Sequence, residues 1–407
     1  MALSKISIEN FKCFHSKQEF TLSTPDGVTA GSGLNIFIGE NNSGKSAVFG
    51  AIAKIKENSQ IFDEEKYAKK DVEIRLHDEL GNEQIIKNIA GSANTDPALW
   101  NVQFPLKYHS LHFLSDSRVW KSDFNDQRMR FDQYRQSTRL ERGYVDSSFA
   151  AALSTLEKEN PEKKAELNKY LRLLIPSFSN WQIGASQKRG NYITYQLLNK
   201  QNLDLDYSVG SGVLNLFKII YGIVDDTKEV LIVDEPEAYL HPKAQQKLGK
   251  LFVDKAKEKQ IIIATHSPYI FQEAVEKKAN LLVFRREKKA IKLIDVREKQ
   301  WGLFPSISPT FSEINYHAYG LFTPEFHNEL YGFVQSKYKR KSVKDMDTFL
   351  CSKADKKKTW KYNRTTYSGL TTYIRNYMHH PEQNSYPPYT KAELAWSTRF
   401  LLRLMKR

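Results

Sequence analysis

The chain has 407 residues, 40% of them hydrophobic, which is enough for a full core and suits two or three domains. It opens without a charged-then-apolar leader, and Lys218 interrupts its longest apolar stretch, so we expect neither secretion nor a membrane span. Cys13 and Cys351 lie far apart and fit no metal-ligand spacing, which indicates a reducing compartment.

The formal net charge of +14 favours an acidic partner, and nucleic acid is the class that fits best. The charge is uneven, because residues 301–407 hold 17 Lys or Arg against 8 Asp or Glu. A charge run of this kind also fits a plain solvated face.

The first third of the chain predicts mainly β structure. Residues 4–14 alternate apolar and polar side chains as a half-buried strand does, and residues 19–23 repeat the pattern, which predicts an opening β-hairpin. Residues 34–38 form an apolar run, and further strands are expected between residues 71 and 115.

The middle of the chain predicts an insert at about residues 119–180. Its first part is charged, aromatic and without period, so we expect a mobile surface segment. Two helices separated near Pro161 follow, and the runs NWQIGAS and NYITYQLLN then predict a second hairpin.

Eight residues after the apolar run 34–38 match a phosphate-binding loop for ATP or GTP. The sequence GENNSGKS precedes a helix-like AVFGAIAKI, which gives the strand–loop–helix order of such a site. Glycines let consecutive backbone N–H groups turn inward, and the helix start directs its positive end at the anion. We expect Lys45 to reach the β- and γ-phosphates and Ser46 to bind Mg²⁺. The predicted nucleotide-binding residues of this loop are Gly39, Asn41, Asn42, Ser43, Gly44, Lys45 and Ser46.

Two further apolar strands end in candidate catalytic side chains. In open α/β sheets, ligands bind at the C-terminal edge of the strands. After residues 230–233, Asp234 is placed to hold Mg²⁺ through water, and Glu235 is placed to act as the general base. After residues 261–265, the neutral imidazole of His266 can donate to the γ-phosphate or position the attacking water.

A Gly-Ser-Gly turn opens an apolar helix in residues 206–220. Gly210, Ser211 and Gly212 can present backbone N–H groups and a hydroxyl to phosphate. The same three residues also fit a plain flexible turn.

In their order, these motifs resemble the ABC-type ATPase heads of the SMC, RecF and OLD group. The resemblance rests on IENFKCF, GENNSGKS, the Gly-Ser turn, DEPEAYLHP and ATHSP, and it covers about residues 1–300. It implies an α/β fold with a mixed sheet flanked by helices, N-terminal β-hairpins and a helical insert. It also implies ATP and Mg²⁺ as cofactors, and two heads that sandwich two nucleotides. The turn at Gly210, Ser211 and Gly212 of one subunit would close over the γ-phosphate bound to the other, although Gly210 stands where the family signature has serine.

Residues 301–407 predict a basic, mainly helical C-terminal domain. Within it, residues 310–334 are expected to be helical and packed. Further on, Arg375 and His380 stand five apart with Asn376 beside the arginine, a spacing that resembles the R-x4-H motif of HEPN domains. That resemblance implies metal-free RNA cleavage, in which Arg375 stabilises a pentacoordinate phosphate and His380 exchanges protons. The same residues also fit an ordinary helix end.

A head of this type with this tail looks like the ATPases of bacterial anti-phage systems. The Septu-type ATPase, which works beside an HNH nuclease and also occurs with retrons, is the first match, and the PARIS-type ATPase with its toprim nuclease is the second. The resemblance implies a cytoplasmic sensor and scaffold that forms a homo-oligomer built from dimers. It would restrain an HNH or toprim partner nuclease and contact DNA or RNA, retron DNA included, without a membrane.

Two alternatives stay open. The chain is itself an ATP-regulated HEPN-type ribonuclease toxin, or it is a RecF-like DNA-repair ATPase whose basic tail holds DNA.

Overall fold

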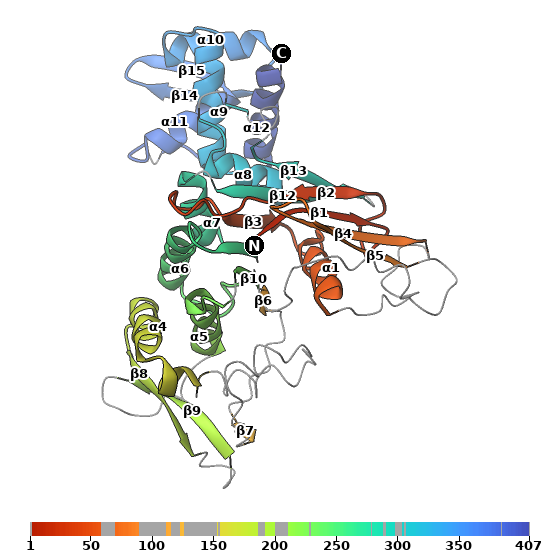
Figure 1. Ribbon diagram of the computed structural model, residues 1–407. Helices are drawn as coiled ribbons and strands as arrows, with labels where there is room; N and C mark the ends of the chain where they lie inside the picture. The colour runs from red at the N-terminus through yellow and green to blue at the C-terminus, as the bar shows by residue number, and fades with distance from the viewer. Residues whose placement is uncertain are drawn as a thin grey trace. The chain divides into compact units, whose positions relative to one another are not determined.

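The protein divides into two compact units, Met1–Arg297 and Glu298–Arg407 (Figure 1). The computed structural model describes residues 2–57, 70–88, 111–114, 123–125, 153, 155–185, 192–199, 211–227, 229–277, 279–287, 290–297, 303–304, 307–383 and 385–406.

The first unit is built on a six-stranded mixed sheet with the strand order β13-β12-β3-β11-β10-β6. Its strands are β3 (Leu34–Gly39), β6 (Leu111–Leu114), β10 (Val230–Asp234), β11 (Gln260–Thr265), β12 (Asn280–Glu287) and β13 (Ala290–Asp295). Neighbouring strands run parallel, except that β13 pairs antiparallel with β12 at one edge. β3 and β11 are buried along their whole length, as central strands of a sheet covered on both faces must be.

A second, antiparallel sheet has the order β2-β1-β4-β5. Its strands are β1 (Leu3–Glu9), β2 (Gln18–Thr21), β4 (Val72–Asp78) and β5 (Glu83–Asn88). The predicted opening hairpin is confirmed, since β1 pairs with β2 and sets Ile6 opposite Phe20. Buried and half-buried residues alternate along β4, so one face of this sheet points to the core.

Helix α1 (Lys45–Glu57) packs against strands of both sheets, and one hydrophobic core joins all three layers. Aromatic rings fill its centre: the ring of Phe37 lies 5.5 Å from that of Phe49 and 5.2 Å from that of Phe284, between centroids. Helices α5 (Ser211–Val224), α6 (Pro242–Lys255) and α7 (Pro268–Glu276) cover the other face of the six-stranded sheet (Figure 1). This arrangement holds the C-terminal ends of β3, β11 and β10 rigidly side by side.

The insert contributes a helix and a small sheet. Helix α4 (Pro161–Leu174) begins at the predicted proline, and Asn160 caps it by accepting the N–H of Lys163 at 3.1 Å. The predicted second hairpin is confirmed as β8 (Phe178–Ala185) and β9 (Tyr192–Asn199), and β9 also pairs with β7 (Asp123–Asn125). Most of the segment expected to be mobile lies outside the described residues.

The second unit is mainly helical. Its helices are α8 (Phe311–Tyr319), α9 (Pro324–Lys337), α10 (Val343–Ser352), α11 (Leu370–His379) and α12 (Lys391–Lys406). Its core includes Phe326 and Leu330 of α9, Leu350 of α10 and Leu401 of α12, all fully buried. The predicted fold class, a mixed α/β head followed by a mainly helical part, is confirmed. None of the described helices is long and apolar enough to cross a membrane.

The basic stretch of the second unit contains a β-hairpin that the sequence analysis did not predict. Strands β14 (Lys357–Tyr362) and β15 (Thr365–Gly369) pair antiparallel. Asn363 and Arg364 form the turn with φ of 45° and 63°, values that match the right-handed twist of a hairpin. Trp360 is fully buried among aromatic rings and anchors the hairpin. The lysines on both sides of Trp360 obscure the alternation of apolar and polar residues that would have predicted a strand.

Candidate nucleotide site

The loop between β3 and α1 requires glycine at two positions. At Gly39, an added Cβ would stand 2.2 Å from the carbonyl oxygen of Phe284 on neighbouring β12. At Gly44, φ is +102° and an added Cβ would lie 3.0 Å from the Cys13 sulfur. Asn42 also has a positive φ, of 60°, which asparagine tolerates better than most residues. The loop is therefore bent in the way that a phosphate cradle needs.

Lys45 lies at the centre of this loop, with only 4% of its surface exposed. Its ammonium group donates to the carbonyl oxygens of Gly39 at 2.9 Å and of Glu40 at 3.0 Å. Burial lowers the pKa of Lys45 to about 8, while the carboxylates of Asp234 and, further on in the same turn, Glu235 oppose that shift. The lysine is thus held at the sheet edge where the carboxylates gather.

The two predicted carboxylates stand at the end of β10. Asp234 lies opposite Ala264 of β11 in the parallel register. Glu235 has a φ of +47°, and its N–H donates to the carbonyl of Ala264 at 2.8 Å. A left-handed glutamate costs about 1 kcal/mol or more and persists only where the surroundings enforce it, which is typical of functional turns. This turn directs Glu235 out of the strand toward the edge of the sheet.

His266 follows β11 and faces Glu235. Its Nε2 lies 4.0 Å from Oε1 of Glu235, so the structure brings the two predicted catalytic side chains together. Burial lowers the pKa of His266, the Lys45 cation lowers it further, and Glu235 opposes both. The imidazole is consequently neutral at physiological pH and can donate or accept one proton.

Glu237 is a site residue that the sequence analysis missed. Its Oε1 accepts the backbone N–H of His266 at 2.6 Å and that of Ser267 at 3.1 Å, and its Oε2 accepts the hydroxyl of Thr265 at 2.8 Å. Burial raises the pKa of Glu237, although these donors oppose the shift. The carboxylate fastens the turn after β10 to the segment that carries His266. The only sequence signal is the second glutamate of DEPE, whose donors lie 28 to 30 residues further along.

Arg286 is a second site residue that the sequence analysis missed. Strand β12 pairs with β3 and continues beyond the phosphate loop, and Nη1 of Arg286 donates to the carbonyl of Asn42 at 3.5 Å. A cation is thereby added to the rim of the loop.

The residues present fit a magnesium ion. Ser46 is exposed at the start of α1, and Asp234 is half-buried at the end of β10, so a hydroxyl and a carboxylate lie at the same sheet edge. Hard oxygen donors of this kind suit Mg²⁺, which usually keeps waters and phosphate oxygens as its other ligands. No cluster of three or more His, Cys, Asp or Glu able to hold a metal occurs in the described part of the chain.

The predicted Gly-Ser-Gly turn is described only in part. Gly210 lies outside the described residues, while Ser211 and Gly212 are the first residues of α5. The Gly-Ser-Gly signature therefore stays a prediction.

The candidate ribonuclease residues belong to the second unit. Arg375 on α11 donates to Oδ1 of Asn376 at 3.0 Å. His380 caps that helix, with Nδ1 3.1 Å from Glu382 and its ring stacked on Tyr362.

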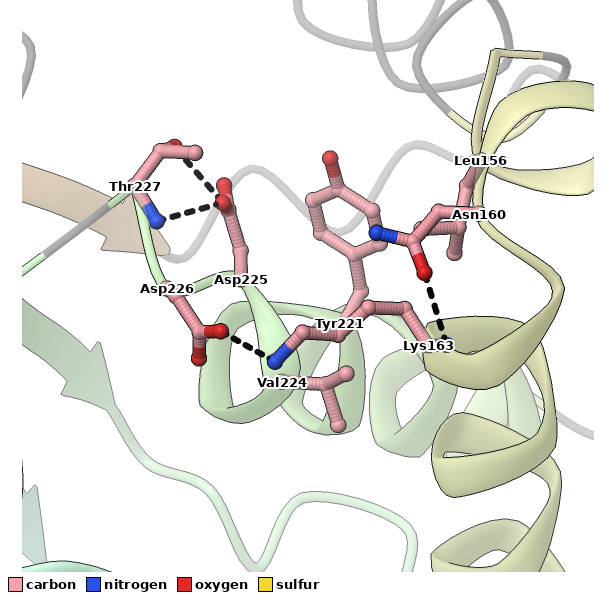
Figure 2. Close-up of a pocket in the computed structure, with 8 residues that line it drawn as sticks. All are labelled: Leu156, Asn160, Lys163, Tyr221, Val224, Asp225, Asp226 and Thr227. Carbon is pink, nitrogen blue, oxygen red and sulfur yellow. Dashed lines mark hydrogen bonds and ion pairs between the residues drawn. The ribbon is translucent and has the colours of Figure 1, made fainter.

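A cavity of about 240 Å³ lies between α4 and α5 in the first unit (Figure 2). Lys163 pairs with Asp226 across it, and Thr227 donates to Asp225. None of the predicted site residues lines this cavity, so its position does not change the assignment of the nucleotide site.

Comparisons with known proteins give two family matches. The family described as "AAA domain, putative AbiEii toxin, Type IV TA system" matches residues 61–272, more than half of the chain. The family described as "AAA ATPase domain" matches residues 1–92. No protein of curated function matches the sequence.

Solved structures with partial similarity include three SMC head domains. A head bound to the C-winged helix domain of ScpA is 14% identical, with 74% of this chain and 99% of that chain covered and a TM-score of 0.48. The head from Thermotoga maritima is 13% identical, with 73% and 100% covered and a TM-score of 0.39. A Pyrococcus furiosus head with an extended coiled coil, bound to the C-terminal domain of ScpA, is 13% identical, with 72% and 96% covered and a TM-score of 0.46. Since these scores lie below 0.5, the assignment rests on the family match.

Proposed function

We propose, for a chain that belongs to the AbiEii-type AAA-domain family, that it binds and hydrolyses ATP and uses the nucleotide state to control a partner nuclease. One observation carries the ATPase part of this proposal. The ends of three adjacent parallel strands hold Lys45, the Asp234–Glu235 turn and His266 within one edge of the sheet, with Glu235 and His266 4.0 Å apart. This is the edge where α/β sheets bind ligands.

The proposed mechanism assigns one role to each side chain. Lys45 leaves the carbonyls of its own loop for the β- and γ-phosphates, whose negative charge restores its high pKa. Mg²⁺, held by Ser46 and by Asp234 through water, would neutralise developing phosphate charge. Glu235 takes a proton from the attacking water, and the neutral imidazole of His266 orients that water or the γ-phosphate.

Two substitutions test this mechanism. Lys45→Ala is expected to abolish ATP binding, because Lys45 is the buried cation that the loop holds for the phosphates. Glu235→Gln is expected to keep ATP bound and to trap a homodimer, since the general base is lost while the nucleotide contacts remain. ATP affinity, phosphate release and native mass are measured for each. If Glu235→Gln hydrolyses ATP at the wild-type rate, Glu235 is not the base.

The partner part of the proposal follows the resemblance to anti-phage ATPases, supported by the toxin-related description of the family. In this role a homo-oligomer built from dimers restrains an HNH or toprim nuclease, in the bacterial cytoplasm, until infection. Co-expression with the adjacent genes tests it. A nuclease that co-purifies with the wild type and dissociates in Lys45→Ala supports this role, and a chain that purifies alone contradicts it.

A second candidate, an ATP-regulated ribonuclease, is favoured by one local observation. Arg375, His379 and His380 gather at the end of α11, where burial lowers the pKa of His379 and the charges of Arg375 and His380 add to the shift. His380→Ala is expected to remove toxicity if this chain cuts RNA. His379→Ala serves as the matched control, and equal toxicity of wild type and His380→Ala would exclude the ribonuclease.

A further inference from the structure

The hairpin β14–β15 presents one face that carries only cations and hydroxyls. Along β14, Lys357, Thr359 and Lys361 are exposed, whereas the residues between them point inward. Along β15, Thr366 and Ser368 are the exposed positions, and Lys361 stands opposite Thr366 in the register. We propose that this outward face, together with Arg364 at the turn, is a binding surface for the phosphate backbone of nucleic acid; it is called the ribbon face below.

The cations of the ribbon face are not neutralised within the described chain. Lys357, Lys361 and Arg364 make no ion pair with any described carboxylate. No Asp or Glu occurs between Asp355 and Glu382, and Asp355 is itself buried against Thr371. Unscreened positive charge therefore accumulates on one side of the hairpin.

The inward face behaves differently, although it also contains a lysine. Lys358 is paired with Glu393 at 2.8 Å and lies over the ring of Tyr373. Trp360 is fully buried, and its ring stacks on Tyr386 at 4.2 Å between centroids. The hydroxyl of Tyr386 also bonds the backbone of Lys361, which fixes the strand that carries the unpaired lysines. The fold thus separates paired from unpaired cations along a single strand.

A rigid, two-stranded ribbon with this chemistry fits nucleic acid. The major groove of B-DNA admits a two-stranded β-ribbon, and lysine, arginine, serine and threonine are common donors to phosphate oxygens. The complementary charge belongs to a polyanion, because isolated surface cations would gain little from a single carboxylate in water. DNA and RNA share this phosphate chemistry, and the test below separates them.

The inward face of the hairpin contacts the end of α11. Tyr362, the last residue of β14, stacks on the ring of His380 at 4.2 Å between centroids. This contact lies on the face opposite the ribbon face and holds the end of the hairpin against the rest of the second unit. The inference goes beyond the proposed function and does not depend on ATP hydrolysis.

Salt-dependent binding to the full-length protein tests the ribbon face. A fluorescein-labelled DNA duplex and an RNA hairpin of the same stem sequence are titrated without nucleotide, and log K is plotted against log salt concentration. Each phosphate contact to B-DNA contributes about −0.9 to the slope, so K357Q/K361Q/R364Q is expected to make the slope less negative by up to about 2.7. The single variant K361Q is expected to change the slope by about 0.9. The control K358Q, one strand position from Lys357 but facing Glu393, is expected to leave the slope unchanged.

The outcomes separate the possibilities. A reduced slope for DNA alone or for RNA alone supports the ribbon face and names its ligand. An unchanged slope in the triple variant, with an unaltered melting temperature, overturns the inference. It is also overturned if the triple variant keeps nucleic-acid binding but loses a co-purifying acidic protein, since the surface then binds protein. Loss of ATP hydrolysis in Lys45→Ala affects none of these readouts, so the two proposals fail independently.

Discussion

Replacing Glu237 tests whether a carboxylate outside the predicted site holds His266 in position. Oε1 of Glu237 accepts the backbone N–H groups of His266 and Ser267, and Oε2 accepts the hydroxyl of Thr265. A glutamine can keep its carbonyl at Oε1 and set its amide against Thr265. An alanine loses all three bonds.

The magnitudes differ accordingly. Each hydrogen-bond donor left unsatisfied in a buried site costs about 1–3 kcal/mol. Glu237 is half-buried, so water can satisfy part of what the alanine leaves open. Glu237→Ala is therefore expected to lower the free energy of unfolding by about 2–4 kcal/mol. Glu237→Gln loses about 1 kcal/mol, because only the polarity of the Thr265 bond is inverted. A misplacement of about 1 Å at a catalytic group costs about 10²-fold in rate, so Glu237→Ala is expected to lower kcat by that order. ATP affinity should change little, since Lys45 is positioned by the carbonyls of its own loop.

Three measurements on each variant decide the matter: kcat from phosphate release, the Kd of ATP, and thermal unfolding. Glu258→Ala is the control, because that glutamate is exposed in the same unit and, among the residues that the structure describes, forms an ion pair only with its neighbour Lys257. Wild-type kcat in a folded Glu237→Ala protein would refute the reasoning. Equal losses of kcat in the alanine and glutamine variants would show that the charge of Glu237, and not its hydrogen bonds, matters.

Three other predictions follow from the geometry. Burial holds the pKa of Lys45 at about 8 and bound phosphates raise it, so ATP binding should take up a proton above pH 8. The Kd of ATP should therefore rise by up to about tenfold per pH unit above pH 8, and a Kd that does not change with pH contradicts this prediction. Burial raises the pKa of Asp355 from 3.8 to about 6, so the folded state binds that proton more tightly and stability should fall by at most about 3 kcal/mol as pH rises from 4 to 6. Urea unfolding across that range should show the slope in wild type and not in Asp355→Asn. Gly44→Ala should lose ATP binding and about 1–3 kcal/mol of stability, seen by titration and melting, because the loop cannot keep a φ of +102°.

Much of the ATPase unit could be predicted from local sequence alone. Runs of apolar residues predicted the buried strands β3 and β11. The glycines and the lysine after β3 predicted the phosphate loop. Parallel strands bring their C-terminal ends to one edge, so the proximity of Glu235 and His266 followed once both strands were recognised.

The second unit was harder to predict. Residues 301–407 predicted a basic, mainly helical domain, but part of this region folds as β14–β15 around the buried ring of Trp360. Only tertiary packing of that tryptophan against Tyr373 and Tyr386 separates the lysines into an inward and an outward set.

The sequence by itself determined the candidate nucleotide site, because the predicted phosphate loop, a strand-end carboxylate pair and a strand-end histidine are each encoded within a few consecutive residues. Only the tertiary structure showed which hydrogen bonds hold that site together and which lysines of β14 have no ion-pair partner among the described residues. Glu237 binds backbone groups 28 to 30 residues away, and Lys358 and Lys361 differ only in what the fold places beside them. The physical reason is the same in both cases: a hydrogen-bond acceptor or a charge acquires its role from its neighbours in space, and local sequence does not specify those neighbours.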